Sequence, residues 1–271
     1  MTRLRSDEID RIPSTMEVSD RAFEMKIGAD ISEVAAHAAG FSGSRATAFD
    51  RSEAKVVPMT SGKGVISGFA QAIAAILNHL GLKTEVASKN DVGGISEAFT
   101  DGAKMVFAAD DEFFVGLNLR NLKVSYNYDA TGRGYAAALE KKIDGLDGKS
   151  VALIGAGRVG SAAAEYMCGR GANVFAYDPL GWKVDELRRR LPLCLKCGTV
   201  AECISRGDHV MLAAPGRNFI TARMIKEGAI FTAPAVPLGF TKAALEKLGQ
   251  DRLIHDKLAL GVATMAFDLV R

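Results

Sequence analysis

The segment that most constrains the fold is residues 151–166, which read VALIGAGRVGSAAAEY. An apolar run of the kind found in buried parallel strands ends in three closely spaced glycines, and a helical pattern begins at once. In such a strand–turn–helix, Gly155 makes the tight turn, Gly157 lets the backbone approach a pyrophosphate, and Gly160 allows close helix–strand packing. The next apolar segment ends in Asp178, whose carboxylate can accept hydrogen bonds from ribose hydroxyls. The pattern predicts a dinucleotide site that comprises Gly155, Ala156, Gly157, Arg158, Val159, Gly160 and Asp178.

The acid at the end of that second strand favours NAD over NADP, because Asp178 would repel a 2′-phosphate. Arg158 lies inside the glycine motif and could face a phosphate, which weakens this preference. A Rossmann fold without a cofactor, or one that binds S-adenosylmethionine, is the alternative. Loops after two later strands would face the nicotinamide ring, although ordinary turns explain them equally well, and they contribute Ala214, Pro215 and Pro234.

From residue 56 onward, strand patterns alternate with helical ones, which predicts an α/β protein with parallel sheets. Six such strands between residues 146 and 271 predict a doubly wound Rossmann domain. Residues 1–145 are expected to form N-terminal helices followed by a smaller α/β substrate domain. The stretch DGLDGKS at 144–150 is the expected boundary. Helices are expected to begin at Ser6, Ser19 and Val65, and another over residues 220–228.

Composition excludes several classes of function. The net charge is +2, with 34 basic and 32 acidic residues largely interleaved, so nucleic acid is not an expected partner. No apolar run approaches the roughly 18 residues of a membrane span, and the N-terminus lacks a signal-peptide core. We therefore expect a cytoplasmic protein with reduced cysteines. Cys194 and Cys197 have CxxC spacing without a second pair or paired histidines, so no metal is expected.

Polar side chains follow the predicted strands of the first half. Ser61 and Lys63 follow the first strand, Asp110 follows the third, and Asn118 and Asn127 lie in an irregular region after it. If the strands are parallel, these groups meet at one edge of the sheet, facing the cofactor domain. Amides and isolated carboxylates suit a zwitterionic or amine-bearing substrate. A role in turns or caps is the alternative for each residue.

Five segments resemble the PylD family of NAD-dependent dehydrogenases, which act in the last step of pyrrolysine biosynthesis: VPMTSGKGVISGF, AKMVFAADDEFFVGLNLRN, VSYNYDATGRGY, LIGAGRVG and LALGVATMAF. The glycine loop is generic, whereas the TSGKG turn, the ADD strand end and the asparagine region are specific. The resemblance implies a substrate in which 3-methylornithine acylates the ε-nitrogen of lysine. It also implies oxidation of the terminal CH–NH2 carbon to an imine, loss of ammonia, and closure of a pyrroline ring.

The resemblance also implies roles for individual residues. Ser61, Lys63, Asp110, Asn118 and Asn127 would line the substrate pocket. Leu4 would close over the substrate and Asp256 would meet one of its amines. Asp110 is the catalytic candidate, since a buried carboxylate can hold an ammonium and then act as base.

Two positions depart from the family pattern and leave the orientation of the substrate open. Lys63 replaces an asparagine of the family, and Asp256-Lys257 replaces a Glu-Pro. The leading hypothesis is a dehydrogenase of the PylD type with a small-molecule, acylated-lysine substrate. The alternatives are an NAD-dependent dehydrogenase for another amine or amino acid and a non-catalytic NAD sensor. A homodimer is left open by the sequence.

Overall fold

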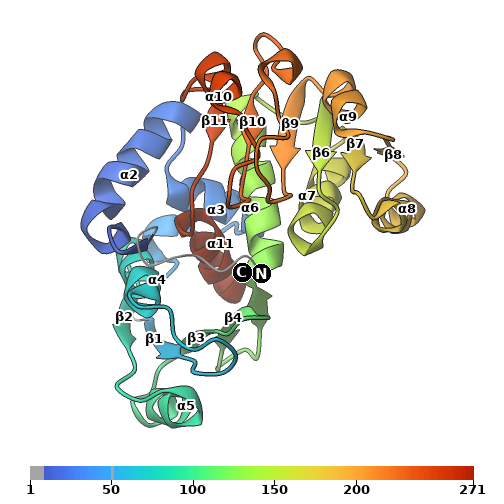
Figure 1. Cartoon of the computed structure of the whole chain (residues 1–271). Helices are drawn as coiled ribbons and strands as arrows, with labels where there is room; N and C mark the ends of the chain where they lie inside the picture. Colours follow the sequence, from blue (N-terminus) through green and yellow to red (C-terminus); the bar gives the residue numbers. More distant parts are fainter. Residues whose placement is uncertain (1–8, 50–51) are drawn as a thin grey trace.

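Two sheets flank a central pair of helices in the computed structural model, which describes residues 9–49 and 52–271 (Figure 1). The first sheet has the order β2-β1-β3-β4-β5. Its strands are β1 (Glu53–Pro58), β2 (Lys83–Val86), β3 (Met105–Ala109), β4 (Phe114–Asn118) and β5 (Val124–Tyr126). Strands β1, β2 and β3 are parallel, as predicted, whereas β4 runs antiparallel to both β3 and β5.

The second sheet has the order β11-β10-β9-β6-β7-β8, and all its strands are parallel. Its strands are β6 (Ser150–Ile154), β7 (Asn173–Tyr177), β8 (Cys194–Lys196), β9 (His209–Leu212), β10 (Phe231–Thr232) and β11 (Leu253–Ile254). Counted from β6, this is the 3-2-1-4-5-6 order of a doubly wound dinucleotide fold. The predicted fold class is therefore confirmed.

Ten α-helices and two 3-10 turns complete the described residues. The α-helices are α2 (Ile12–Ile27), α3 (Ile31–Ala39), α4 (Phe69–His79), α5 (Asp91–Thr100), α6 (Asn127–Lys142), α7 (Arg158–Gly169), α8 (Gly181–Arg190), α9 (Val200–Arg206), α10 (Lys242–Leu248) and α11 (Ala259–Val270). The 3-10 turns are η1 (Arg45–Thr47) and η2 (Ala222–Met224). None of these helices is long and apolar enough to cross a membrane.

Helix α11 lies at the centre of the molecule, beside α6 (Figure 1). Its sequence, ALGVATMAFDLV, is apolar almost all round, as expected for a helix that is buried on every side. It packs on α3, α6, β4 and β5, although its chain segment follows the Rossmann sheet. One hydrophobic cluster includes residues of both halves, and two smaller clusters lie within single halves. The division at residue 145 therefore stays a prediction, and the last helix joins the two halves.

Several predicted helix boundaries differ from the structure. Helix α2 is continuous through Ser19, so that residue does not begin a helix. Helix α4 begins at Phe69 instead of Val65, after Gly68 in a left-handed conformation. The helix expected over residues 220–228 is only the short turn η2. The helix start expected at Ser6 lies outside the described residues.

Candidate functional site

A cavity of about 670 Å³ lies where the carboxyl ends of the two sheets face each other. Small-molecule sites fall in a range of about 300–1,000 Å³. The first half contributes the segments that follow β1 and β3 and the first turn of α6. The second half contributes the glycine loop, the loops after β9 and β10, and residues 257–258. The site therefore has the position expected from the topology of a doubly wound sheet.

The glycine loop has the steric properties that a dinucleotide requires. A Cβ on Gly155 would lie 2.8 Å from the backbone nitrogen of Ala214, and one on Gly160 would lie 1.9 Å from the carbonyl oxygen of Gly155. Neither position could carry a side chain without moving the backbone. A Cβ on Gly157 would meet nothing within 4 Å, so the backbone there is open to a pyrophosphate. The loop therefore fits NAD.

Asp178 is held at the rim of this loop by two backbone groups. Its Oδ2 accepts the N–H of Ala156 at 2.9 Å, and its Oδ1 accepts the N–H of Leu180 at 2.9 Å. Six of the other predicted cofactor residues lie in one of two places. Ala214 lies behind the loop against Gly155. The residues that line the cavity are Gly157, Arg158, Val159, Pro215 and Pro234.

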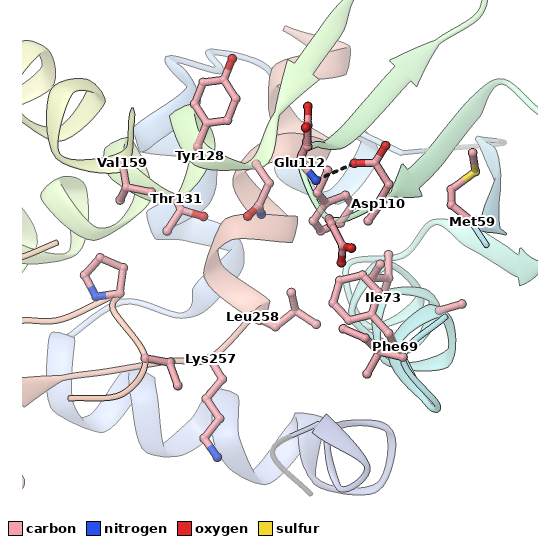
Figure 2. Close-up of a pocket in the computed structure, with 18 of the residues that line it drawn as sticks. Met59, Phe69, Ile73, Asp110, Glu112, Tyr128, Thr131, Val159, Lys257 and Leu258 are labelled. Atoms are coloured by element: carbon pink, nitrogen blue, oxygen red, sulfur yellow. Dashed lines mark hydrogen bonds between the residues drawn. The ribbon is translucent and has the colours of Figure 1, made fainter. Parts of the chain in front are cut away.

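Asp110 directly follows β3 and lines the opposite wall of the cavity. Its Oδ1 accepts the backbone N–H groups of Glu112 at 2.8 Å and Phe113 at 2.7 Å, so a tight turn fixes the carboxylate (Figure 2). Asp111 and Glu112 also line the cavity, which gives this wall three adjacent carboxylates. The rest of the wall is apolar and includes Val56, Ile66, Phe69, Ile73 and Leu258. Such a wall suits an amine carried on an aliphatic chain.

The TSGKG loop is tied to the acidic wall. The backbone N–H of Lys63 donates to Asp111 Oδ2 at 2.6 Å, and Thr60 donates through its backbone N–H to Asp91 at 2.8 Å. Ser61 and Lys63 are exposed on the loop, next to the cavity, while the following residues 64–66 line it. The loop thus forms a lip of the cavity, and its glycines let it lie against Asp111.

The two predicted asparagines lie at opposite ends of the strands of the first sheet. Because β4 is antiparallel to β3, Asn118 pairs with Met105 at the start of β3, away from Asp110. Its amide donates to the carbonyl of Leu269 at 2.9 Å and accepts the N–H of Arg120, which anchors the end of α11. The expectation that Asn118 joins the other polar groups rested on parallel strands and is wrong in this respect. Strand β5 reverses direction again, and Asn127 after it lines the cavity.

Asp256 caps the first turn of α11. Its Oδ1 accepts the N–H groups of Leu258 and Leu260, each at 3.0 Å. Burial raises the pKa of the Asp256 carboxyl, and these backbone donors act in the opposite direction. The next two residues, Lys257 and Leu258, line the cavity. In Figure 2 the ammonium end of Lys257 points away from Asp110. Leu4, predicted to close over the substrate, lies outside the described residues.

Comparison with known proteins finds a matching family model for each half of the chain. Residues 8–125 match the family model "Pyrrolysine biosynthesis protein PylD, N-terminal domain". Residues 118–232 match "D-isomer specific 2-hydroxyacid dehydrogenase, NAD binding domain". A protein named pyrrolysine synthase from Methanosarcina barkeri is 27% identical over 100% of this chain and 98% of its own length. Its counterpart from Methanosarcina acetivorans is 28% identical over 79% of this chain and 81% of its own. These matches support membership of the PylD family.

Two solved structures have a similar fold. Quinate dehydrogenase from Corynebacterium glutamicum in complex with NAD has a TM-score of 0.55 at 14% identity, covering 81% of this chain and 93% of the other. Shikimate dehydrogenase from Aquifex aeolicus has a TM-score of 0.54 at 16% identity, covering 79% and 88%. At such low identity these similarities show the fold alone.

Several cavity residues were not predicted from the sequence. Tyr128 and Thr131 lie near the start of α6 (Figure 2), and Thr131 is one helical turn from both Asn127 and Tyr128. Their spacing of three and four residues could have indicated a shared face, once a helix start at Asn127 was known. Glu112 and Leu258 also line the cavity. Glu112 directly follows the predicted Asp110, whereas nothing in the local sequence around Leu258 indicates its role.

Proposed function

We propose that this chain is the NAD-dependent dehydrogenase that oxidises the terminal amine carbon of 3-methylornithyl-N6-lysine and so yields pyrrolysine. The observation that carries the proposal is the cavity itself. There the PylD-type N-terminal domain, with the carboxylate of Asp110, faces the glycine loop of the NAD-binding domain. The binding site for the hydride acceptor therefore lies beside an acidic, partly apolar pocket that suits an amine.

The reaction balances with NAD as the sole oxidant. NAD held at the glycine loop, against Gly157, would supply the acceptor for the hydride of the amine-bearing carbon. The carbon–nitrogen single bond becomes an imine as a proton leaves the nitrogen. Water then adds to the imine carbon, ammonia departs and an aldehyde remains. The free α-amine attacks that aldehyde and loses water, which closes the pyrroline ring.

In this reaction Asp110 holds the reacting amine and receives its proton. Its Oδ1 is engaged by the turn, so Oδ2 is the oxygen that meets the substrate. Asn127, across the cavity, is suited to orient a polar group of the substrate, because an amide can both donate and accept. Ser61 and Lys63 are proposed as contacts at the lip. Asp256 is proposed to contact an amine of the substrate, or to hold Lys257 and Leu258 in place at the cavity.

The direct test mixes purified protein, NAD and 3-methylornithyl-N6-lysine. We expect NADH by absorbance and a product by mass spectrometry that has lost one ammonia and two hydrogens. NADH formation only with other amines would overturn the substrate and keep the reaction type. NAD binding by calorimetry, without turnover of any amine, would favour a non-catalytic sensor.

The Asp110→Asn variant tests the proposed base. The amide is nearly isosteric and can still accept the two backbone N–H groups, so the turn is expected to persist. We expect kcat to fall on the order of 100- to 10,000-fold, the usual contribution of a positioned acid or base. The NAD dissociation constant, measured by calorimetry, should stay within about threefold. Unchanged kcat would contradict the assignment of Asp110.

A small-molecule substrate is the expected partner. The cytoplasmic location and a homodimer remain proposals, and size-exclusion chromatography with light scattering tests the second of these.

A further inference from the structure

Arg158, inside the glycine motif, lies against two aromatic rings of the other half of the molecule. Its guanidinium carbon is 5.1 Å from the ring centroid of Phe113 and 5.1 Å from that of Tyr128. Phe113 lies just before β4, and Tyr128 lies in the first turn of α6. Tyr126 stacks on Tyr128 with centroids 5.3 Å apart. Arg158, Phe113 and Tyr128 thus form a clasp between the cofactor loop and the substrate half.

Each aromatic residue of the clasp is connected through its backbone to a polar residue of the cavity. The backbone N–H of Phe113 donates to Asp110 Oδ1 at 2.7 Å, and the N–H of Asp110 donates to the carbonyl of Phe113 at 2.8 Å. Displacing Phe113 therefore displaces the carboxylate. On the other side, Tyr128 directly follows Asn127, which also lines the cavity. The position of both polar groups relative to the glycine loop thus depends on the clasp.

We infer that Arg158 is a positioning residue: through Phe113 and Tyr128 it fixes Asp110 and Asn127 opposite the cofactor loop. The inference rests on the proposed amine-oxidising function of this cavity. The planar guanidinium suits this task, because it presents a flat face to an aromatic ring as well as a charge. The first-turn N–H groups of α7 can receive a pyrophosphate without help from Arg158. The side chain is therefore available to bridge the two halves.

Two variants separate stacking from charge. Arg158→Lys keeps the positive charge and removes the planar face, and Phe113→Leu keeps an apolar side chain and removes the ring. We expect each to lower kcat/KM for the amine on the order of 10-fold, with the NAD dissociation constant within about threefold of wild type. The double variant should be no worse than the poorer single variant, because both changes break the contact between Arg158 and Phe113.

Arg206→Lys is the matched control. Arg206 lies 4.3 Å from the ring centroid of Phe175, but both residues belong to the Rossmann half and neither lines the cavity. The same chemical change there should leave kcat/KM and NAD affinity unaltered. A fall comparable to that of Arg158→Lys would mean that any loss of such a pair impairs the enzyme, and would overturn the specific role of the clasp.

Hydrogen exchange gives a readout that needs no substrate. The amides of Glu112 and Phe113 donate to Asp110, so both should exchange faster in Arg158→Lys and in Phe113→Leu than in wild type or Arg206→Lys. Failure of the amine substrate with this exchange pattern intact would refute the proposed function alone. If Arg158→Lys weakens NAD binding while Phe113→Leu changes neither kinetics nor exchange, Arg158 is a phosphate ligand and the inference is wrong.

Discussion

The strongest quantitative prediction concerns Gly62, in the TSGKG loop. Its φ is +70°, and a Cβ there would lie 2.3 Å from Oδ2 of Asp111 and 2.9 Å from Cγ of Asp111. Gly64, two residues later, has φ +79°, and a Cβ there would meet nothing within 4 Å. The two glycines therefore share the backbone conformation and differ in what surrounds them, which makes Gly64→Ala a matched control for Gly62→Ala.

The expected magnitudes follow from these contacts. Alanine in the left-handed region costs about 1–2 kcal/mol, and both variants bear that cost. Gly62→Ala also pushes the Asp111 carboxylate away from the N–H of Lys63, a charge-assisted hydrogen bond of 2.6 Å whose loss costs about 1.5–3 kcal/mol. Because residues 64–66 line the cavity, a displaced loop impairs substrate binding. We expect kcat/KM of Gly62→Ala to be about 10- to 150-fold below that of Gly64→Ala.

The assay measures kcat/KM for the amine at saturating NAD, with thermal unfolding alongside to exclude global destabilisation. Placing Gly62→Ala in an Asp111→Ala background removes the contact with the carboxylate. There Gly62→Ala should cost no more than Gly64→Ala does in the wild type. Equal values of kcat/KM for the two glycine variants in the wild-type background would refute the reasoning.

Two further predictions concern the cofactor and acid stability. Asp178→Ala should weaken NAD binding by about 1–3 kcal/mol through lost ribose hydrogen bonds, and NADP binding less; calorimetry that finds unchanged NAD affinity would contradict this role. Hydrogen bonds from the hydroxyl and backbone N–H of Ser88 lower the pKa of Glu97 to about 2 from 4.5. The stability from this lowered pKa is present above pH 4.5 and is lost as the pH falls towards 2. As the pH falls from 4.5 to 2, the urea unfolding midpoint of Glu97→Gln should therefore decrease less than that of the wild type. Equal decreases in the two midpoints would argue against a stabilising role for the Glu97 carboxylate.

Local sequence rules succeeded where neighbouring residues decide the structure. The glycine motif, its apolar strand and the acid at Asp178 lie close together in the chain, so their spacing predicted the cofactor loop, and the alternation of strand and helix patterns predicted the second sheet. Asp110 was located at a strand end for the same reason. Helix boundaries were less accurate. The glycines at 64 and 68 delay α4, and Ser19 lies within a continuous α2, because a serine can face solvent inside a helix as well as cap one.

Local sequence rules did not predict the direction of each strand in the sheet. In the sequence, Asn118 and Asn127 lie in the same irregular region; in the structure, Asn118 ends β4 and Asn127 follows β5. Only the antiparallel pairing of β4 with β3 and β5 sends the first to anchor α11 and the second to the cavity. Pairing depends on which strands meet across the sheet, and the residues of one strand do not specify its partner.

The sequence by itself determined the α/β class, the Rossmann half, the preference for NAD and the resemblance to the PylD family, because each depends on residues close together in the chain. The tertiary structure decided which polar groups share the cavity, the central place of α11 and the stacking of Arg158 between Phe113 and Tyr128. These features join segments that lie far apart in sequence. Packing of the whole core sets the distances between these segments, so no local sequence pattern predicts them.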